Sequence, residues 1–467
     1  MSKTATPSRK KSKKTKASRS NTPEVVAATP AQELAELIRT RQAKVAVIGL
    51  GYVGLPLARA FCLAGFPVTG FDIDPRKIES LRRGESYILQ TDSDWIKQKS
   101  KEGKFHATDE FRHLRQMNAI IICVPTPLTK TFDPDMSYIE KTANEIRNYL
   151  DRGQLIVLES TTYPGTTEEV VKPILEASGL ECGKDFFLGF SPEREDPGNK
   201  KFHTIIIPKL VGGLDATSGR LAQDLYAAAI AKVIPVSHAK VAEAAKILEN
   251  IYRCVNIALV NELKMCFDRM GIDVWEVIQA ASTKPFGFHP FYPGPGLGGH
   301  CIPIDPFYLT WKAREYGFTT RFIELAGEIN TSMPHYVVER TVEAMNLRHK
   351  TINGSKGLII GIAYKPDVDD IRESPAFEVI ELLQKRGARI SYHDPFVPRI
   401  PKMRHHDIQL ESVALKAEAL REFDFGIIIT HHSGIDWDLL VRHLPLVVDT
   451  RNACSGVREN REKIVKA

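Results

Sequence analysis

The sequence lacks long hydrophobic runs. None of its 467 residues falls in an apolar stretch of roughly eighteen or more, and the N-terminus is polar where a signal peptide would have an apolar core. We therefore expect neither a membrane span nor export, and the cytoplasm is the expected compartment. With 43% hydrophobic and 26% charged residues, the composition is typical of a globular enzyme or binding protein of two or three domains.

Cysteines are few and scattered. The seven stand at positions 62, 123, 182, 254, 266, 301 and 454, an odd number without a C-x-x-C pair. This spacing indicates neither a disulfide framework nor a zinc site, so we predict reduced thiols and no bound metal. For most such cysteines the ordinary interpretation is a small buried apolar side chain.

Acidic residues are absent from the first twenty positions, which carry eight Lys and Arg. This segment accounts for the net charge of +6, and the rest of the chain is slightly acidic. Residues 1–30 are nearly free of large apolar side chains, so we expect a disordered basic tail. The tail could contact an anionic partner, but a solubilising or dispensable extension is the preferred interpretation. We expect no nucleic acid to bind the folded body.

A glycine-rich turn between an apolar strand and a helix is the first motif with chemical content. The apolar run 44–48 is followed by Gly49-Leu50-Gly51-Tyr52-Val53-Gly54 and by a helical pattern over 55–65. In this context G-x-G-x-x-G predicts a dinucleotide site. Its glycines permit a tight turn, close approach of the pyrophosphate and close helix packing, while the helix N-terminus favours the negative charge.

The residue that follows the second strand indicates which dinucleotide binds. A strand over 67–71 ends at Asp72. An aspartate in this place accepts hydrogen bonds from the adenosine ribose and favours NAD over NADP. Because Arg76 lies nearby and could bind a 2′-phosphate, NADP is the alternative.

Strand and helix patterns continue to alternate. We predict strands over 119–124, 154–159 and 186–190, and helices over 138–150, up to 178 and over 215–229. This alternation predicts a doubly wound parallel sheet, whose ligands bind at the carboxyl ends of the strands. Pro125-Thr126-Pro127, Ser160-Thr161 and Pro192-Glu193 all follow such ends.

A long helical region without strand signals occupies residues 238–270, after a short helix expected at 31–42 and before another at 320–347. Apolar residues at 241, 245, 248, 251, 252, 255, 258 and 259 predict a wide buried face on a domain-bridging or dimer-forming helix. Lys246 and Asn250 point the same way because they are four residues apart. The pattern alone favours an exposed pair without function.

A second glycine-rich segment leads to a cysteine. Gly294, Gly296, Gly298 and Gly299 fall within six positions, and Cys301 follows after His300. The glycines let the backbone approach a ligand closely, so a nucleophilic Cys301 is the first hypothesis and a buried apolar thiol the alternative. The preceding residues, 281–293, mix Pro, Gly and aromatics and indicate a loop shaped around a ligand.

Strand and helix patterns restart at residue 356 and predict a second, smaller α/β domain. Strands are expected over 357–362, 389–393, 425–430 and 446–449, with helices over 375–386 and 434–443. Lys365, Arg372 and Arg451 are candidate contacts to a phosphate or sugar, against solvated surface charges as the default. We predict two Rossmann-like domains joined by a long central helix: 31–235 binding NAD, 236–350 central, and 351–467 binding the other ligand.

Seven motifs together resemble the UDP-glucose/GDP-mannose dehydrogenase family. They are the GLGYVGLP turn, Cys-Val-Pro-Thr-Pro, Glu-Ser-Thr-Thr-Tyr-Pro-Gly, Ser-Pro-Glu-Arg, Lys246 with Asn250, Gly-Gly-His-Cys with Asp305, and Ala-Tyr-Lys-Pro-Asp-Val-Asp-Asp-Ile-Arg-Glu-Ser. The resemblance runs from residue 43 to about 455, in family order. It implies a four-electron oxidation of a sugar C6 alcohol to a carboxylate with two NAD.

The resemblance also implies roles for single residues. Cys301 would hold the aldehyde as a thiohemiacetal and then as a thioester, which water hydrolyses. Lys246 would stabilise oxyanions, and Asn250 would be a fixed hydrogen-bond partner. Asp305 would orient or deprotonate a water. The spacing from Cys301 to Asp305 puts both on one side of a helix, although Pro303 and Pro306 limit it to a short turn.

Glu193 with Thr161 would assist the water that hydrolyses the thioester. We assign the NAD contacts to Gly49, Gly51, Tyr52, Val53, Gly54, Asp72, Pro125, Thr126, Thr161 and Arg372. We assign the substrate contacts to Glu193, Arg194, Lys246, Asn250, Gly294, Gly296, Gly298, Gly299, Lys365 and Arg451.

The sequence departs from the family pattern at two places. Some members carry a second glutamate four residues after the one matching Glu193, where this chain has Pro197, and Glu195 is left without a role. The basic tail lies outside the resemblance.

Within the family, the segment 282–306 most resembles members that oxidise UDP-N-acetylglucosamine for polysaccharide synthesis. UDP-glucose, UDP-N-acetylgalactosamine, UDP-N-acetylmannosamine and GDP-mannose are the alternatives. Outside enzymes, the alternative is a protein that senses NAD or a nucleotide sugar. A homodimer or a higher homo-oligomer is expected.

Overall fold

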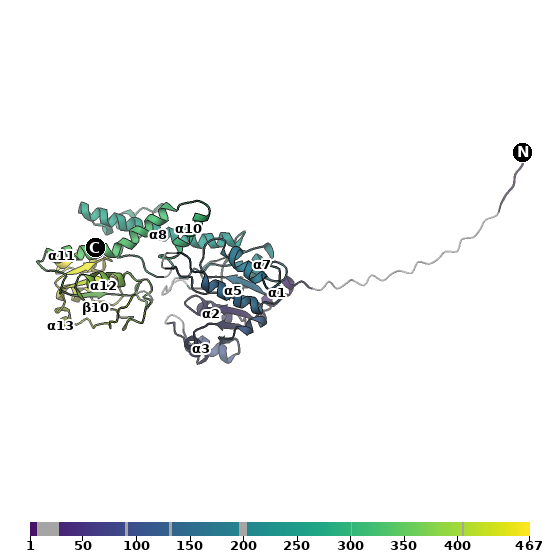
Figure 1. Ribbon diagram of the computed structural model, residues 1–467, viewed down its shortest axis with the longest axis horizontal. Coiled ribbons are helices and arrows are strands. Elements are labelled where there is room, and N and C mark those ends of the chain that lie inside the picture. Colours follow the sequence, from purple (N-terminus) through teal and green to yellow (C-terminus); the bar gives the residue numbers. More distant parts are fainter. Residues whose placement is uncertain (7–27, 89–91, 130–132, 196–202, 300, 404–405) are drawn as a thin grey trace.

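The computed structural model describes residues 1–6, 28–88, 92–129, 133–195, 203–299, 301–403 and 406–467. Two α/β lobes lie beside each other, and long helices run along one side of both (Figure 1). Most of the predicted basic tail, as well as Pro197 and His300, lies outside the described residues. No helix within the described ranges is long and apolar enough to cross a bilayer.

The first lobe is built on a sheet with the strand order β3-β2-β1-β4-β5-β6-β7-β8. The strands are β1 (Val45–Ile48), β2 (Val68–Phe71), β3 (Phe105–Thr108), β4 (Ala119–Ile122), β5 (Leu155–Leu158), β6 (Phe187–Phe190), β7 (Lys209–Gly213) and β8 (Val233–Pro235). From β1 to β6 neighbouring strands are parallel, so their carboxyl ends share one edge. This confirms the predicted doubly wound architecture.

The direction of β7 differs from the prediction. β7 runs antiparallel to β6, and β8 runs parallel to β7. The described part of the connection 191–208 contains no helix, so the chain turns back beside β6 instead of crossing over a face of the sheet. The first residue of β7, Lys209, therefore lies at the carboxyl edge of the parallel strands. β3, β7 and β8 were not among the predicted strands.

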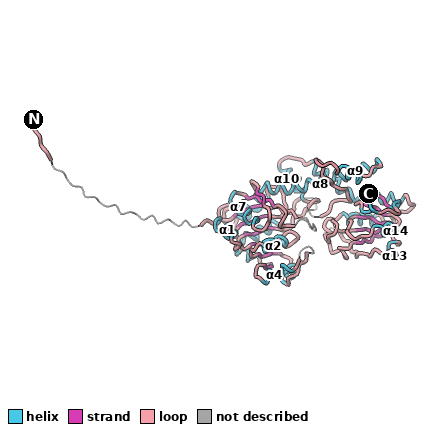
Figure 2. The backbone as a smooth tube through the Cα atoms, turned by 180° about the vertical axis from the view of Figure 1, so that it is seen from behind, coloured by secondary structure: helices cyan, strands magenta, loops and turns pink. Residues whose placement is uncertain are grey.

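Helices cover both faces of this sheet because side chains along each buried strand alternate between the faces. Val45 and Val47 pack with α1, α2 and α7, whereas Ala46 and Ile48 pack with α5 and α6. The helices are α1 (Pro30–Arg39), α2 (Gly54–Leu63), α3 (Pro75–Arg82), α4 (Asp94–Lys101), α5 (Ser137–Tyr149), α6 (Lys172–Glu176) and α7 (Ala216–Ala227). Figure 2 shows the strands of each lobe enclosed between helices.

Two long helices connect the lobes. The central elements are α8 (Ala239–Met270), α9 (Val274–Ala281), α10 (Asp305–Glu315) and α11 (Arg321–Asn346). The first turn of α8 packs into the first lobe through Ala239 and Ala242, and the second half of α11 packs into the second lobe through Val337 and Met345. The position of each lobe therefore depends on the helices that lie between them.

Half of the apolar stripe predicted on α8 faces outward in the single chain, and the rest is buried or half-buried. Val241, Leu248, Tyr252 and Leu259 are exposed, Leu248 by 65%. The face turned into the protein mixes apolar side chains with polar ones, among them Lys246 and Asn250. The expectation of an exposed Lys246 and Asn250 was therefore wrong, because both side chains point into the protein.

The second lobe has the strand order β10-β9-β11-β12-β13, with all neighbours parallel. Its elements are β9 (Lys356–Ile360), β10 (Arg389–His393), β11 (Phe425–Ile428), β12 (Val447–Asp449), β13 (Ile464–Lys466), α12 (Pro375–Lys385), α13 (Ala417–Leu420) and α14 (Trp437–His443). Sheet residues pack against α11 and α12 on one face and against α13 and α14 on the other.

The two lobes use the same device to fix the turn after their first strand. In the first lobe, a carboxylate oxygen of Asp72 accepts from the backbone N–H of Leu50 at 2.9 Å. In the second lobe, Asp394 accepts from the N–H groups of Ile362 and Ala363 at 2.8 and 3.0 Å. Each aspartate directly follows the second strand of its lobe, and each is buried. Charged acceptors hold backbone donors strongly, so both turns are rigid.

Candidate functional site

The candidate site lies where the carboxyl edge of the first sheet meets α8 and the start of α10. Thr126, Thr161 and Glu193 follow the ends of β4, β5 and β6, as predicted. α8 contributes Lys246 and Asn250 from its third and fourth turns. The structure thus brings the strand-end residues together with the buried face of α8.

Lys246 carries the central positive charge. Lys246 is only 5% exposed, and its Nζ donates to the backbone oxygen of Glu193 at 2.5 Å. A carboxylate oxygen of Glu193 lies 3.7 Å from the same Nζ. Burial opposes the charge, but Glu193, Cys301 and Asp305 together raise the pKa of Lys246. The amine is therefore an ammonium suited to stabilising an oxyanion.

Asp305 presents an open acceptor to the site. Its Oδ2 accepts from Nδ2 of Asn250 at 2.6 Å, and both residues are buried. Its Oδ1 is also buried and has no hydrogen-bond partner among the described residues. Burial raises the pKa of Asp305 to about 7, while Lys246 and Asn250 oppose this shift. Near neutral pH the carboxyl group can therefore both accept and release a proton.

Cys301 stands one turn before Asp305. The N–H of Asp305 donates to the Cys301 carbonyl at 2.8 Å, and α10 continues for eleven residues. The expectation that prolines limit this segment to a short turn was wrong, because Pro306 occupies the first turn of α10, where no intrahelical donor is lost. Burial, and to a lesser extent the nearby Asp305, raises the pKa of the Cys301 thiol to about 12, whereas Lys246 opposes the shift. The resting side chain is a thiol.

The glycines before Cys301 allow the loop to pack against the second lobe. A Cβ at Gly298 would lie 2.6 Å from Cβ of Tyr364, and one at Gly299 would lie 2.9 Å from the ring of that tyrosine. Gly299 also has φ +81° and donates its N–H to the carbonyl of Arg372 at 3.0 Å. Cβ atoms at Gly294 and Gly296 would press on Arg451 and on Pro375. These glycines join the two lobes beside Cys301, and contact with a sugar nucleotide stays a prediction.

The glycines of the first lobe have separate tasks. A Cβ at Gly49 would overlap the carbonyl of Cys123, and one at Gly54 would overlap the carbonyl of Gly49. A Cβ at Gly51 would meet no described atom within 4 Å. Two glycines therefore close the turn, and the third leaves free the surface at which a pyrophosphate approaches the helix N-terminus. These residues fit NAD.

Asp72 occupies the predicted ribose position, with contacts of its own. Its Oδ2 accepts from Nζ of Lys77 at 2.8 Å as well as from the Leu50 N–H, and its Oδ1 accepts from the N–H of Asp74. The remaining acceptor capacity of the two oxygens suits ribose hydroxyls. Arg76, the residue of the 2′-phosphate alternative, forms an exposed ion pair with Asp74.

Arg372 brings the second lobe to the dinucleotide loop. Its guanidinium lies over the ring of Tyr52 at 5.1 Å and pairs with Asp370 at 2.6 Å. Tyr52 belongs to the G-x-G-x-x-G turn, so a residue from the far lobe closes over the predicted NAD site. The assignment of Arg372 to cofactor binding fits this placement.

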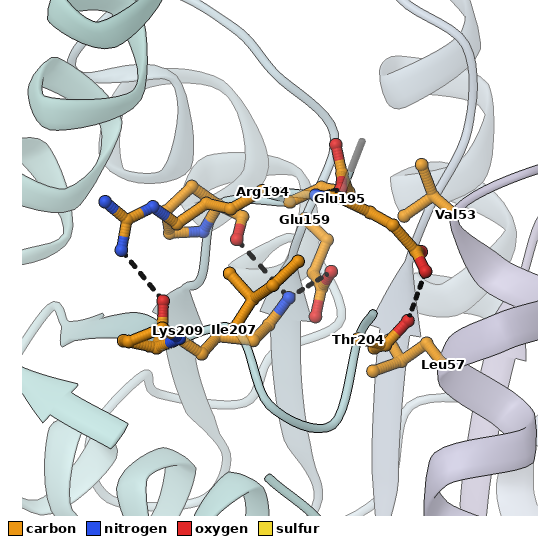
Figure 3. A pocket seen from close by; sticks show the side chains of 11 residues that line it. Val53, Leu57, Glu159, Arg194, Glu195, Thr204, Ile207 and Lys209 are labelled. Carbon is orange, nitrogen blue, oxygen red and sulfur yellow. Dashed lines mark hydrogen bonds and ion pairs between the residues drawn. The ribbon is translucent and has the colours of Figure 1, made fainter. Parts of the chain in front are cut away.

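Several predicted contacts are engaged within the protein. Arg194 pairs with Glu249 at 2.5 Å and donates to the carbonyl of Pro208 at 2.8 Å, as Figure 3 shows in part. Glu195, left without a role by the sequence, accepts from the hydroxyl of Thr204 at 2.8 Å. Arg451 donates from Nε to the carbonyl of Ile429 at 3.0 Å. Lys365 is half-buried in the loop after β9 that also carries Arg372.

Two residues on α8 were missed by the sequence analysis. Glu243 is fully buried and accepts from the N–H groups of Gly165 and Thr167 at 2.6 and 2.9 Å, which fixes the loop that carries Thr161. Arg253 lies near enough to lower the pKa values of both Cys301 and Asp305. The helical spacing of three residues from Lys246 and from Asn250 is the signal that could have indicated them.

Comparisons with known proteins cover most of the chain. Models of the UDP-glucose/GDP-mannose dehydrogenase family match in three parts: the NAD binding domain over residues 43–230, the central domain over 240–332 and the UDP binding domain over 358–456. They follow one another in the order of the two lobes and the helices between them.

Curated relatives act on different sugars. UDP-N-acetyl-D-glucosamine 6-dehydrogenase of Pseudomonas aeruginosa is 40% identical over 367 residues, which is 78% of this chain and 86% of that protein. UDP-N-acetyl-D-mannosamine dehydrogenase of Pyrococcus horikoshii is 35% identical over 420 residues, 88% of this chain and 95% of the relative. The structure of UDP-D-ManNAc dehydrogenase from Pyrococcus horikoshii superposes with a TM-score of 0.82 at 31% identity, covering 91% of this chain and 98% of that one.

The geometry of the first glycine turn predicts opposite outcomes for two alanine substitutions. Gly51→Ala should fold normally and weaken NAD binding by about tenfold or more, because the added methyl meets only the ligand. Gly54→Ala, the matched control, should lower the melting temperature, because its methyl meets backbone. Thermal unfolding and NAD titration by fluorescence measure both effects. An unchanged NAD affinity in Gly51→Ala would contradict the assignment.

Proposed function

We propose that this chain, which belongs to the UDP-glucose/GDP-mannose dehydrogenase family, oxidises the C6 alcohol of a UDP-N-acetylhexosamine to the carboxylate, with UDP-N-acetylglucosamine as the preferred substrate. The chain is an NAD-dependent oxidoreductase. The observation that carries the proposal is the burial of Lys246, Asn250 and Asp305 together beside Cys301, with one carboxylate oxygen of Asp305 unpaired among the described residues.

Cys301 accounts for the oxidation beyond the aldehyde. NAD, when bound, accepts a hydride from the sugar carbon in each of the two oxidation steps. The thiol adds to the aldehyde carbon, its sulfur forming a C–S bond while its proton passes to Oδ1 of Asp305. Loss of the second hydride gives a thioester, and attack by water then breaks the C–S bond and releases the acid. The covalent bond keeps the aldehyde in the site between the two oxidations.

The other residues act on charge and on water. The Lys246 ammonium stabilises the oxyanion that forms in each addition to carbon. Asn250 fixes Oδ2 of Asp305, so that Oδ1 faces the reacting atoms. Glu193 and Thr161, from neighbouring strand ends, assist the attacking water. Lys246, Asn250 and Asp305 lie on helices, which suits the precise placement that catalysis requires.

The preferred sugar is a proposal supported by similarity alone. Relatives named for UDP-N-acetyl-D-glucosamine are 40% and 39% identical, whereas one named for UDP-N-acetyl-D-mannosamine is 35% identical. UDP-glucose, UDP-N-acetylgalactosamine, UDP-N-acetylmannosamine and GDP-mannose are the alternative substrates. The product, a uronic acid on a nucleotide, suits polysaccharide synthesis in the cytoplasm.

The substrate proposal predicts the outcome of an NADH-production assay with UDP and GDP sugars. Oxidation of UDP-N-acetylglucosamine should release two NADH per sugar and a product heavier by the exchange of CH₂OH for a carboxylate. Cys301→Ser should bind NAD normally and form no acid. A higher kcat/KM for another sugar would change the substrate assignment. Normal acid formation by Cys301→Ser would disprove the covalent step.

The raised pKa of Asp305 predicts a pH dependence. As a proton acceptor, Asp305 works only when ionised, so kcat should rise with pH through about 7 and level off above it. Asp305→Asn should lower kcat by about a hundredfold or more and abolish this limb. Asp407→Asn, at an exposed carboxylate in the second lobe, is the control and should leave the profile unchanged. An unaltered pH limb in Asp305→Asn would rule out this role.

We further propose a homodimer formed through the exposed apolar face of α8. Val241, Leu248, Tyr252 and Leu259 span about 27 Å of one helix side, and a second copy would bury this self-complementary stripe about a two-fold axis.

Light scattering of a double variant tests the dimer. Leu248→Glu with Tyr252→Glu should turn a dimer into a monomer, because two charges would enter an apolar contact. Lys141→Glu, on the exposed side of α5, serves as the charge-matched control and should remain dimeric. A monomeric wild-type protein would refute the proposal.

A further inference from the structure

A buried ionic cluster behind Glu193 has no part in the chemistry described above. Nζ of Lys209 lies 2.8 Å from Oε2 of Glu159, and the hydroxyl of Tyr226 donates to the other carboxylate oxygen. Lys209 is 6% exposed, and the other two residues are fully buried. Figure 3 shows Lys209 with its contact to Glu159, beside Arg194 and Glu195.

Lys209 reaches this place because β7 reverses direction. It is the first residue of an antiparallel strand, so it lies level with the residues that follow β6. From there its Nζ donates to the backbone carbonyl of Pro192 at 3.3 Å. The other end of β7, Gly213, pairs with Gly189 inside β6, away from this edge.

Two buried lysines hold consecutive carbonyls of one peptide segment. Lys209 donates to Pro192 from the side of the sheet, and Lys246 donates to Glu193 from α8. The segment that carries Glu193 is therefore held by hydrogen bonds from two ammonium groups on different sides. A shift at Pro192 would move both the Glu193 carboxylate and the acceptor that positions Lys246.

Packing around the same segment is incomplete. A small pocket of about 20 Å³ separates residues 192–195 from Val53 and Leu57 at the start of α2. This volume is enough for about one water molecule. Beside this gap, the segment is held by the hydrogen bonds that its two carbonyls accept from Lys209 and Lys246.

Stability alone does not account for the cluster. A buried ion pair is often matched or exceeded in stability by apolar residues of similar volume, because both charges lose their hydration. Burial raises the pKa of Glu159 and that of Tyr226, and Lys209 opposes the shift of Glu159. An apolar trio could fill the same space, but it could not donate a directed hydrogen bond to Pro192.

We infer that Lys209, held by Glu159 and Tyr226, is a positioning residue that fixes the Pro192–Glu193 peptide and thereby aligns Glu193 with the attacking water during thioester hydrolysis. The inference rests on the proposed function. Since Glu193 assists the second half of the reaction, loss of Lys209 should slow hydrolysis more than the first hydride transfer.

Single-turnover kinetics of the full-length enzyme tests this inference. In Lys209→Met, the first NADH should form within about threefold of the wild-type rate, whereas acid release should slow by about tenfold or more. A covalent thioester on Cys301 should then accumulate and be visible by intact-protein mass. Lys209→Arg should restore most of the hydrolysis rate, because its guanidinium can still donate to the carbonyl of Pro192.

Two further variants separate positioning from folding. Lys209→Met combined with Glu159→Gln removes the stranded carboxylate and should show the same split between the two steps. Lys264→Met is the matched control: Lys264 is also a buried lysine in an ion pair, with Asp268, but it lies in the second half of α8. Its loss should leave the ratio of the two rates unchanged.

The outcomes distinguish this inference from the proposed function. If wild-type enzyme yields two NADH per sugar and the Lys209 variants slow both steps equally, the positioning role is overturned and the proposed reaction stands. If wild-type enzyme forms acid without a Cys301 adduct, the covalent reaction fails and the Lys209 inference fails with it.

Discussion

The burial of one ammonium group, that of Lys246, is the constraint on which the site depends. A charged amine taken from water costs several kcal/mol unless acceptors surround it. The groups that offset this cost come from elements far apart in the chain. Glu193, which follows β6, accepts from Nζ, and the carboxylate of Asp305, which begins α10, adds a nearby negative charge. The close approach of these elements, and hence the joining of the first lobe to the central helices, is what keeps this charge stable in the interior.

Much of the fold could be predicted because its signals are local. These signals are the apolar strands, the G-x-G-x-x-G turn and the helical periodicity of α8 and α11. All of them depend on residues close in sequence. The reversal of β7 could not be predicted, because it depends on the path of residues 191–208 rather than on β7 itself. The apolar face of α8 was found, but periodicity does not tell whether such a face meets its own chain or another copy.

The site was harder to predict than the fold. Lys246, Asn250 and Asp305 are ordinary polar residues until the fold buries them together, and the pattern alone placed the first two on the surface. Resemblance to a family of enzymes supplied their roles. Glu243 was indicated only by its helical spacing from Lys246, and Lys209 by nothing. Each contacts backbone groups of another segment, N–H donors for Glu243 and a carbonyl for Lys209, and such partners leave no trace in sequence.

The charges of the site explain how a nucleophile can rest safely within it. Burial raises the pKa of Cys301 to about 12 and that of Asp305 to about 7, so the resting site holds a thiol, not a thiolate. A thiol is a weak nucleophile and resists alkylation and oxidation. The proton needs to leave only when an aldehyde is present, since the oxyanion then forming beside Lys246 gains the stabilisation that a free thiolate lacks. In the proposed reaction, reactivity is thereby coupled to the substrate, and Cys301 is activated only in the step that uses it.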